Sequence, residues 1–195
     1  MLHVTPDAKR FYTTNGGSGT VSVFEELLLP PTMPPTGVLP AGAKPRLDWV
    51  QTLVPVGQGA EGFDVSPDGG ELWTATPEGV LSIVDLANKK VAATVNLALP
   101  GAHRLAFTPD GRRVLLVSVR TGELVVYDAA SRREVKRLTV GCGATMLMDP
   151  VSNRAFVSCT PDNYIAVVDL KTLTVAGRLD GGGRPDGLAW AVRPE

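Results

Sequence analysis

Apolar residues along the chain come in short runs, and each run is bounded by residues that favour turns. The stretch RLAF (104–107) is followed by TPDG, and after this turn comes the apolar run RVLLVSV (113–119). Proline presets φ at the second position of such a turn, and glycine suits the fourth. No segment keeps a helical period over about ten residues. The pattern therefore predicts an all-β chain of short strands.

The runs are organised as an internal repeat. The segments FDVSPDGGELWTAT (63–76), LAFTPDGRRVLLVS (105–118) and MLMDPVSNRAFVSC (146–159) align without gaps. Their prolines, Pro67, Pro109 and Pro150, lie 42 and 41 residues apart. A second phrase follows each segment, as GVLSIVDLANKK, GELVVYDAASRR and NYIAVVDLKTLT. Each unit thus contains a short apolar strand, two longer apolar strands and a half-polar fourth strand.

Four strands repeated every ~40 residues are typical of a β-propeller blade. We therefore expect an all-β propeller of four-stranded antiparallel blades, with about four blades in a single domain over residues 1–195. The expected boundaries are blade 1 at 1–59 with a proline-rich insertion at 26–47, blade 2 at 60–101, blade 3 at 102–141, blade 4 at 142–183 and a closing strand at 184–195.

The first unit, TPDAKRFYTTNGGSGTVSVFE (5–25), resembles the YVTN-type propeller repeats, with Tyr12-Thr13-Thr14-Asn15 at the position that names them. The resemblance covers most of the chain outside 26–47. It implies a seven-bladed propeller of a bacterial or archaeal protein in the periplasm, the envelope or outside the cell. Seven blades need about 300 residues, whereas this sequence has 195 and begins without the pattern of a secretion signal.

The short chain leaves two interpretations of its ends. Either the ring has four blades and is closed by its own tail, or these are the last blades of a longer propeller, in which case the chain should be poorly stable alone or should self-associate. Under both interpretations the strand Gly187–Val192 belongs beside Arg10–Asn15.

The insertion at 26–47 contains six prolines, which oppose both a central strand and a helix. We expect an extended, polyproline-like loop. It is either a docking loop for a partner or an exposed insertion without one.

Polar residues gather where each innermost strand begins, on the face where propellers usually bind ligands. Alignment of the repeats places Glu61, His103 and Asp186 at corresponding positions, with Arg104 and Arg184 beside them. Such a ring can bind a polar ligand or a metal. The alternative is a solvated loop face.

Other chemistry has little support in the sequence. There are two histidines and two cysteines, and no haem, iron–sulfur or zinc spacing. The glycine-rich segments NGGSG and DGGGRPDG do not precede predicted helices, so they are turns rather than phosphate loops. We predict no catalytic residue, no cofactor and no metal site.

Cys142 and Cys159 lie on two strands of one predicted hairpin, which brings them close together. They form a disulfide if the protein is exported, or they remain two free buried thiols.

The net charge of −1 indicates no nucleic-acid partner, and no apolar stretch is long enough to span a bilayer. These observations favour a non-enzymatic binding or scaffold protein for an unknown protein or small polar ligand. The alternative is an enzyme, which on the same resemblance is a lactonase-type hydrolase or a propeller subunit of a quinone- or haem-dependent dehydrogenase.

Overall fold

The computed structural model describes residues 1–191 and contains four antiparallel sheets of four strands each. The predicted all-β, propeller-like fold is therefore confirmed. The helical structure of the described part is one 3₁₀ turn, η1 (Thr160–Asp162).

Each sheet contains four consecutive strands, hydrogen-bonded in sequence order. Blade 1 consists of β1 (Leu2–Val4), β2 (Arg10–Asn15), β3 (Thr20–Leu29) and β4 (Arg46–Pro55). Blade 2 consists of β5 (Phe63–Val65), β6 (Glu71–Ala75), β7 (Val80–Asp85) and β8 (Lys90–Asn96). Blade 3 consists of β9 (Ala102–Phe107), β10 (Arg113–Ser118), β11 (Glu123–Asp128) and β12 (Arg133–Thr139). Blade 4 consists of β13 (Gly143–Met148), β14 (Arg154–Cys159), β15 (Tyr164–Asp169) and β16 (Thr174–Asp180).

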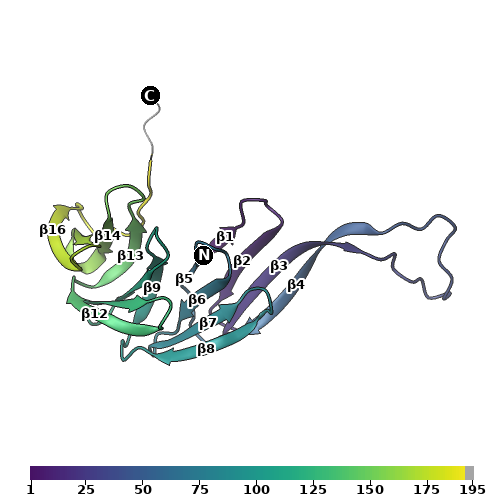
Figure 1. Cartoon of the computed structure of the whole chain (residues 1–195), viewed down its shortest axis with the longest axis horizontal. Coiled ribbons are helices and arrows are strands. Elements are labelled where there is room, and N and C mark those ends of the chain that lie inside the picture. The colour runs from purple at the N-terminus through teal and green to yellow at the C-terminus, as the bar shows by residue number, and fades with distance from the viewer. Residues whose placement is uncertain (192–195) are drawn as a thin grey trace.

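The four sheets follow one another along an open arc (Figure 1). The innermost strands β1, β5, β9 and β13 lie toward its concave side, and the outer strands β8 and β12 lie toward its convex side. Blade 1 forms one end of the arc and blade 4 the other.

The core is divided among the three junctions between neighbouring blades. Each of three apolar clusters combines side chains from one face of a blade with side chains from the facing side of the next blade. At the junction of blades 2 and 3, Trp73 packs edge-on against Phe107 with ring centroids 5.5 Å apart. Because successive side chains of a strand point to opposite faces, the middle strands β7 and β11 contribute to two junctions. Their near-continuous burial follows from this.

The proline-rich insertion is only partly a loop. Strand β3 continues to Leu29 and pairs with β4 as far as Leu29↔Arg46, so both ends of the predicted loop are paired strand. The expectation of an irregular segment over 26–47 was wrong at these ends, because the six prolines all fall within residues 30–45. Residues 26–47, which consist of the paired ends of β3 and β4 and the loop between them, project from blade 1, and we call this segment the arm (Figure 1).

The expected closing strand is absent from the described residues. Strand β1 itself pairs with β2, from Leu2↔Thr13 to Val4↔Phe11. Residues 184–191 lie in no strand, and the rest of the predicted element, from residue 192, lies outside the described residues. The place that we assigned to Gly187–Val192 is thus taken by the chain's own first strand.

Gly62 stands where blades 2 and 3 come closest. A Cβ atom at this position would overlap the carbonyl oxygen of His103 and lie 2.9 Å from Cα of Arg104. We predict that Gly62→Ala lowers the free energy of unfolding by about 1–3 kcal/mol, because rigid backbone must move to accept the methyl group. Urea denaturation followed by circular dichroism measures this change.

Gly177→Ala is the matched control, because no atom lies within 4 Å of its added methyl group. It should leave stability unchanged or raise it slightly. Equal effects of the two substitutions would contradict the close approach of the blades at Gly62.

Candidate functional site

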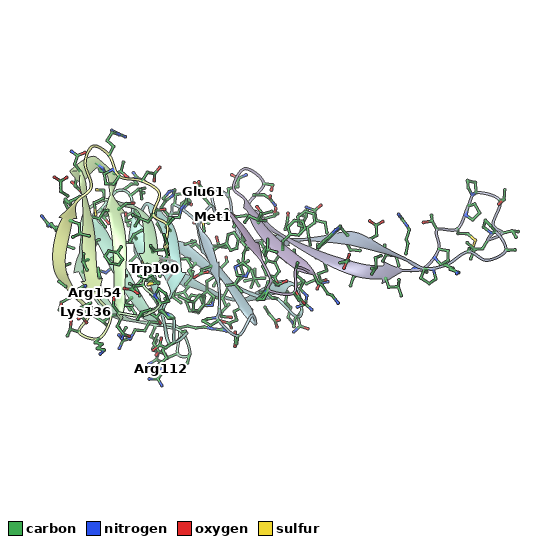
Figure 2. All side chains as sticks on the ribbon, turned by 90° about the horizontal axis from the view of Figure 1, so that it is seen from above. Met1, Glu61, Arg112, Lys136, Arg154 and Trp190 are labelled. Atoms are coloured by element: carbon green, nitrogen blue, oxygen red, sulfur yellow. The ribbon has the colours of Figure 1, made fainter. Side chains whose placement is uncertain are left out.

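Three of the five predicted site residues meet at the junction of blades 2 and 3. Glu61 precedes β5, whereas His103 and Arg104 belong to β9. Oε1 of Glu61 lies 3.3 Å from Nη2 of Arg104, and its Oε2 lies 3.8 Å from Nδ1 of His103. Figure 2 shows Glu61 at the rim of the sheets, at the starting end of the inner strands. The carboxylate therefore bridges two basic side chains of the next blade.

The other two residues lie on the segment after blade 4. The carbonyl of Asp186 accepts a hydrogen bond from the Ser158 hydroxyl at 2.7 Å, and the amide of Arg184 donates to Oδ1 of Asn163 at 2.9 Å. The carboxylate of Asp186 acts on His103 through its charge. Arg184 makes no ion pair among residues 1–191. Asp186 therefore influences the three-residue cluster only through its charge, and Arg184 forms no ion pair with it.

The surroundings of His103 lower the pKa of its imidazole. Partial burial lowers its pKa first, and the positive charge of Arg104 lowers it further. The negative charges of Glu61 and Asp186 oppose both effects without reversing them. A neutral imidazole can both donate and accept a hydrogen bond.

One nitrogen of the Arg104 guanidinium has no hydrogen-bond partner in the described part of the chain. Nη1 is shielded from solvent, while Nη2 of the same group contacts Glu61. A buried donor left without an acceptor costs about 1–3 kcal/mol. Arg104 therefore has one guanidinium nitrogen paired with Glu61 and one that is buried without an acceptor in the described part of the chain.

Asp64 is a polar residue of this junction that the sequence analysis missed. Oδ2 of its carboxylate accepts the backbone N–H of Phe107 at 2.8 Å, across from β5 to β9. Burial raises the pKa of Asp64, and two backbone hydrogen bonds partly oppose the rise. Its position between the apolar residues Phe63 and Val65 on an innermost strand was the signal that could have revealed it.

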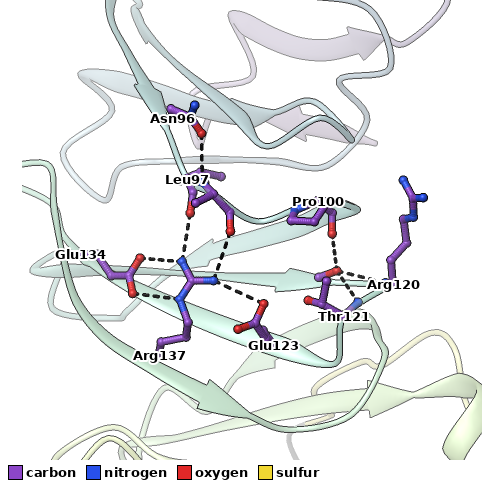
Figure 3. Close-up of polar contacts among 10 residues, drawn as sticks. Asn96, Leu97, Pro100, Arg120, Thr121, Glu123, Glu134 and Arg137 are labelled. Atoms are coloured by element: carbon purple, nitrogen blue, oxygen red, sulfur yellow. Dashed lines mark hydrogen bonds and ion pairs between the residues drawn. The ribbon is translucent and has the colours of Figure 1, made fainter.

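The segment leading into β9 is held by an arginine of the outer strand. Arg137 donates from Nη2 to the carbonyl of Leu97 at 3.0 Å and from Nη1 to that of Ala98 at 3.3 Å (Figure 3). Glu134 and Glu123 face the same guanidinium at 2.8 and 3.3 Å. The connection between blades 2 and 3 is therefore fixed by charged hydrogen bonds.

A second contact fixes the next turn of this connection. The Ser118 hydroxyl donates to the carbonyl of Pro100 at 2.7 Å and accepts the backbone amides of Arg120 and Thr121 (Figure 3). His103 and Arg104 follow directly, so their positions are set by contacts outside the site.

A hollow of about 410 Å³ lies at the opposite ends of the same inner strands, between the turns of blades 2 and 3. Its polar side chains are already paired, as Ser66 with Asp68 at 2.5 Å and Arg132 with Glu71 at 2.7 Å. Among the described residues the buried side-chain nitrogen without a partner belongs to Arg104 and not to this hollow, so we place the candidate site at Arg104.

The two cysteines are free thiols in the structure. Cys159 is buried, and its thiol donates to the carbonyl of Val140 at 3.3 Å. Ser118 occupies the same repeat position and makes the same kind of contact with Pro100. The arrangement gives Cys159 a structural part in the blade.

The described residues contain no group of three or more His, Cys, Asp or Glu side chains that could hold a metal ion. The cluster places a guanidinium, an imidazole and a carboxylate side by side, and these groups can hydrogen-bond a polar ligand. Within residues 1–191 no helix has the length and apolar character needed to cross a membrane.

The chain matches no family model. A segment of 64 residues, which is 33% of the chain, is 41% identical to 13% of dihydro-heme d1 dehydrogenase from Pseudomonas aeruginosa. The fold is similar to hydrazine synthase from Kuenenia stuttgartiensis, with a TM-score of 0.72 and 14% identity over 91% of this chain and 47% of that one. It is also similar to a functionally unknown protein from Desulfotomaculum acetoxidans, with a TM-score of 0.71 and 16% identity over 94% of this chain and 56% of that one. The chain therefore spans about half the length of these solved structures, and the likeness shows the fold alone.

Stability should depend on pH through His103. Its lowered pKa means that the unfolded chain takes up a proton more readily than the folded chain. We predict that the free energy of unfolding falls as the pH is lowered from about 7.5 to 5.5, through the ordinary histidine pKa of about 6.5. Urea denaturation at both pH values should show a smaller fall in His103→Gln.

The control is His3→Gln, which removes the other histidine and should retain the fall seen in the wild type. If His103→Gln and the wild type lose equal stability, burial does not hold His103 neutral.

Proposed function

We propose that this chain is a β-propeller binding module that holds a small polar, negatively charged ligand at the junction of blades 2 and 3. The observation that carries the proposal is the cluster of Glu61, His103 and Arg104 at the rim, in which Nη1 of Arg104 has no acceptor among residues 1–191. Because this nitrogen is shielded, a ligand oxygen reaches it only when the side chains around it move. A carboxylate oxygen is a suitable acceptor, since hydrogen bonds between ions are shorter and stronger than neutral ones.

The neighbouring groups favour a ligand that also carries hydroxyl groups. Neutral His103 can donate to or accept from a hydroxyl, and Glu61 can accept from one. Its Oε1 already contacts Arg104, and Oε2 faces His103 at 3.8 Å. A hydroxycarboxylate therefore fits the hydrogen-bonding groups of the cluster, with Arg104 as its positively charged donor.

Citrate is a suitable probe because it combines carboxylates with a hydroxyl group. We predict that isothermal titration calorimetry detects citrate binding to the wild-type chain, and that Arg104→Gln weakens it at least about tenfold. Loss of one charged hydrogen bond corresponds to about 1.5–3 kcal/mol, or a factor of ten or more.

Arg133→Gln makes the same change of charge at an exposed position on β12 and should bind citrate as the wild type does. Absence of citrate binding by the wild type, or equal binding by Arg104→Gln, would contradict the proposed ligand class.

A second candidate function is supported by the 41% identical segment shared with dihydro-heme d1 dehydrogenase. On that basis the chain is part of a redox protein that holds a haem-type tetrapyrrole. Histidine is a residue type that ligates haem iron, and Arg104 can pair with a carboxylate substituent of a tetrapyrrole. The name of that enzyme makes dihydro-heme d1 the molecule that is dehydrogenated, so the tetrapyrrole would be bound as a substrate.

Titration with haemin distinguishes this candidate. We predict a shift of the haem absorption band on mixing with the wild-type chain, which His103→Ala abolishes and His3→Ala preserves. A wild-type spectrum identical to that of free haemin, or a shift that survives His103→Ala, would rule out His103 as the iron ligand.

The YVTN-type resemblance supports two further parts of the proposal, membership of that repeat family and a place in the bacterial envelope or outside the cell. The lactonase alternative stays a prediction from the resemblance.

A further inference from the structure

We call the side of a blade that is directed toward the next blade its forward face, and the side directed toward the preceding blade its backward face. The forward face of blade 4 has the same kind of apolar side chains as the forward faces that are buried in the other blades. Tyr12, Trp73, Leu115 and Phe156 occupy one repeat position on the second strand of each blade. The first three are buried against the following blade, with 2%, 0% and 1% or less of their surface exposed. Phe156 points to the same side of blade 4 but is only half-buried, because no described blade follows it.

The backward face of blade 1 shows the same incompleteness. In blade 2, Phe63, Val65, Leu72 and Val84 turn toward blade 1 and are buried in its junction. Their counterparts in blade 1 are Leu2, Val4, Phe11 and Phe24, which form an apolar face at the end of the arc. Leu2 and Val4 are 66% and 51% exposed. Phe11 stacks on Phe24 with centroids 4.3 Å apart, and Trp49 extends this face toward the arm, 5.1 Å from Phe11.

The arm begins at the turn between the third and fourth strands of blade 1. In the later blades the same turn contacts the preceding blade. In blades 2 and 3 this turn carries Lys89 and Arg132, which pair with Glu25 and Glu71 of the blade before. The corresponding position in blade 1 is Leu29, where β3 continues as the arm. The arm points away from blades 2 to 4 (Figures 1 and 2). It therefore extends toward the place that a preceding blade would occupy.

The segment after blade 4 leads toward a following blade. The Ser158 hydroxyl holds the carbonyl of Asp186 at 2.7 Å, and Thr14, at the same repeat position of blade 1, holds that of Glu61 at 2.6 Å. Residues 184–186 thus follow the path by which the chain passes from blade 1 into blade 2.

We propose that two copies of this chain close head to tail into an eight-bladed ring. The forward face of blade 4 in each copy packs on the backward face of blade 1 in the other. A two-fold axis makes the two contacts identical and leaves neither face uncovered. Eight blades lie within the usual range for propellers.

A second copy is the occupant that the faces favour, because one chain carries both halves of the same type of junction. A different protein would have to supply a forward face and a backward face together. In the ring, residues 184–186 lead toward the partner's first blade, and the arm lies along the partner's fourth. Residues 188–191 leave this path, because the partner's β1 takes the innermost position.

Analytical ultracentrifugation of the full chain over a range of micromolar concentrations tests the proposal. The wild type should sediment as a dimer. Val4→Asp on the backward face and Leu179→Asp on the forward face should each weaken dimerisation ~100-fold, because a carboxylate would be buried without a partner. Val4 and Leu179 are 51% and 49% exposed in the single chain, so neither substitution disturbs its core.

Val135→Asp is the matched control, since Val135 is 50% exposed on the outer strand of blade 3 and should leave the dimer intact. Mixing Val4→Asp with Leu179→Asp should restore a dimer, because one junction then joins two unaltered faces. Thermal melting checks that each variant is folded, and Leu2→Asp replaces Val4→Asp if the latter is not.

Three results would overturn the proposal. The first is a wild type that stays monomeric, whether its faces are open or are covered by further blades of its own polypeptide. The second is a dimer that only one of the two face variants disrupts, which would indicate a contact between identical faces. The third is growth into larger assemblies, which would mean that the head-to-tail contact does not close.

Discussion

Blades 2 and 3 of this protein are covered on both sides by other apolar sheets. Side chains of a strand alternate between faces, and here both faces of the sheets are apolar. Trp73 and Leu72 are neighbours in the sequence, yet they are buried in different junctions, one with blade 3 and the other with blade 1. A single blade has no core of its own, because each cluster requires two blades. Stability therefore arises from the junctions rather than within the sheets.

The same constraint creates the candidate site. The innermost strands β5 and β9 belong to different sheets, so their facing backbone groups have no ladder partners at the junction. Asp64 supplies an acceptor for one of them, and the missing side chain of Gly62 allows the backbones to approach. Arg104 lies at this contact, where Glu61 pairs with Nη2 of its guanidinium but not with Nη1. Packing thus brings a charged donor into a shielded position and leaves it without an acceptor.

The candidate site and the two end faces are separate features of the arc. The site lies at a junction that is complete within one chain, whereas the end faces belong to junctions of which the chain supplies one half. Ligand binding and association can therefore be altered independently. The arm belongs with the end faces, since it continues the strands of blade 1 beyond the sheet.

The repeat, the four-stranded unit and the all-β class could be predicted from the amino-acid order, because turn residues and apolar runs are local signals with a fixed period. The amino-acid order also placed Glu61, His103 and Arg104 near one another, since residues at corresponding repeat positions lie on one rim. It could not reveal the unpaired nitrogen of Arg104 or the part played by Asp64, which depend on how two blades approach. It likewise misplaced the tail and the ends of the insertion. Strand pairing can join segments that are far apart in the sequence, so local patterns do not specify it. Here β1 pairs with β2 and the ends of the arm pair with each other, both within blade 1.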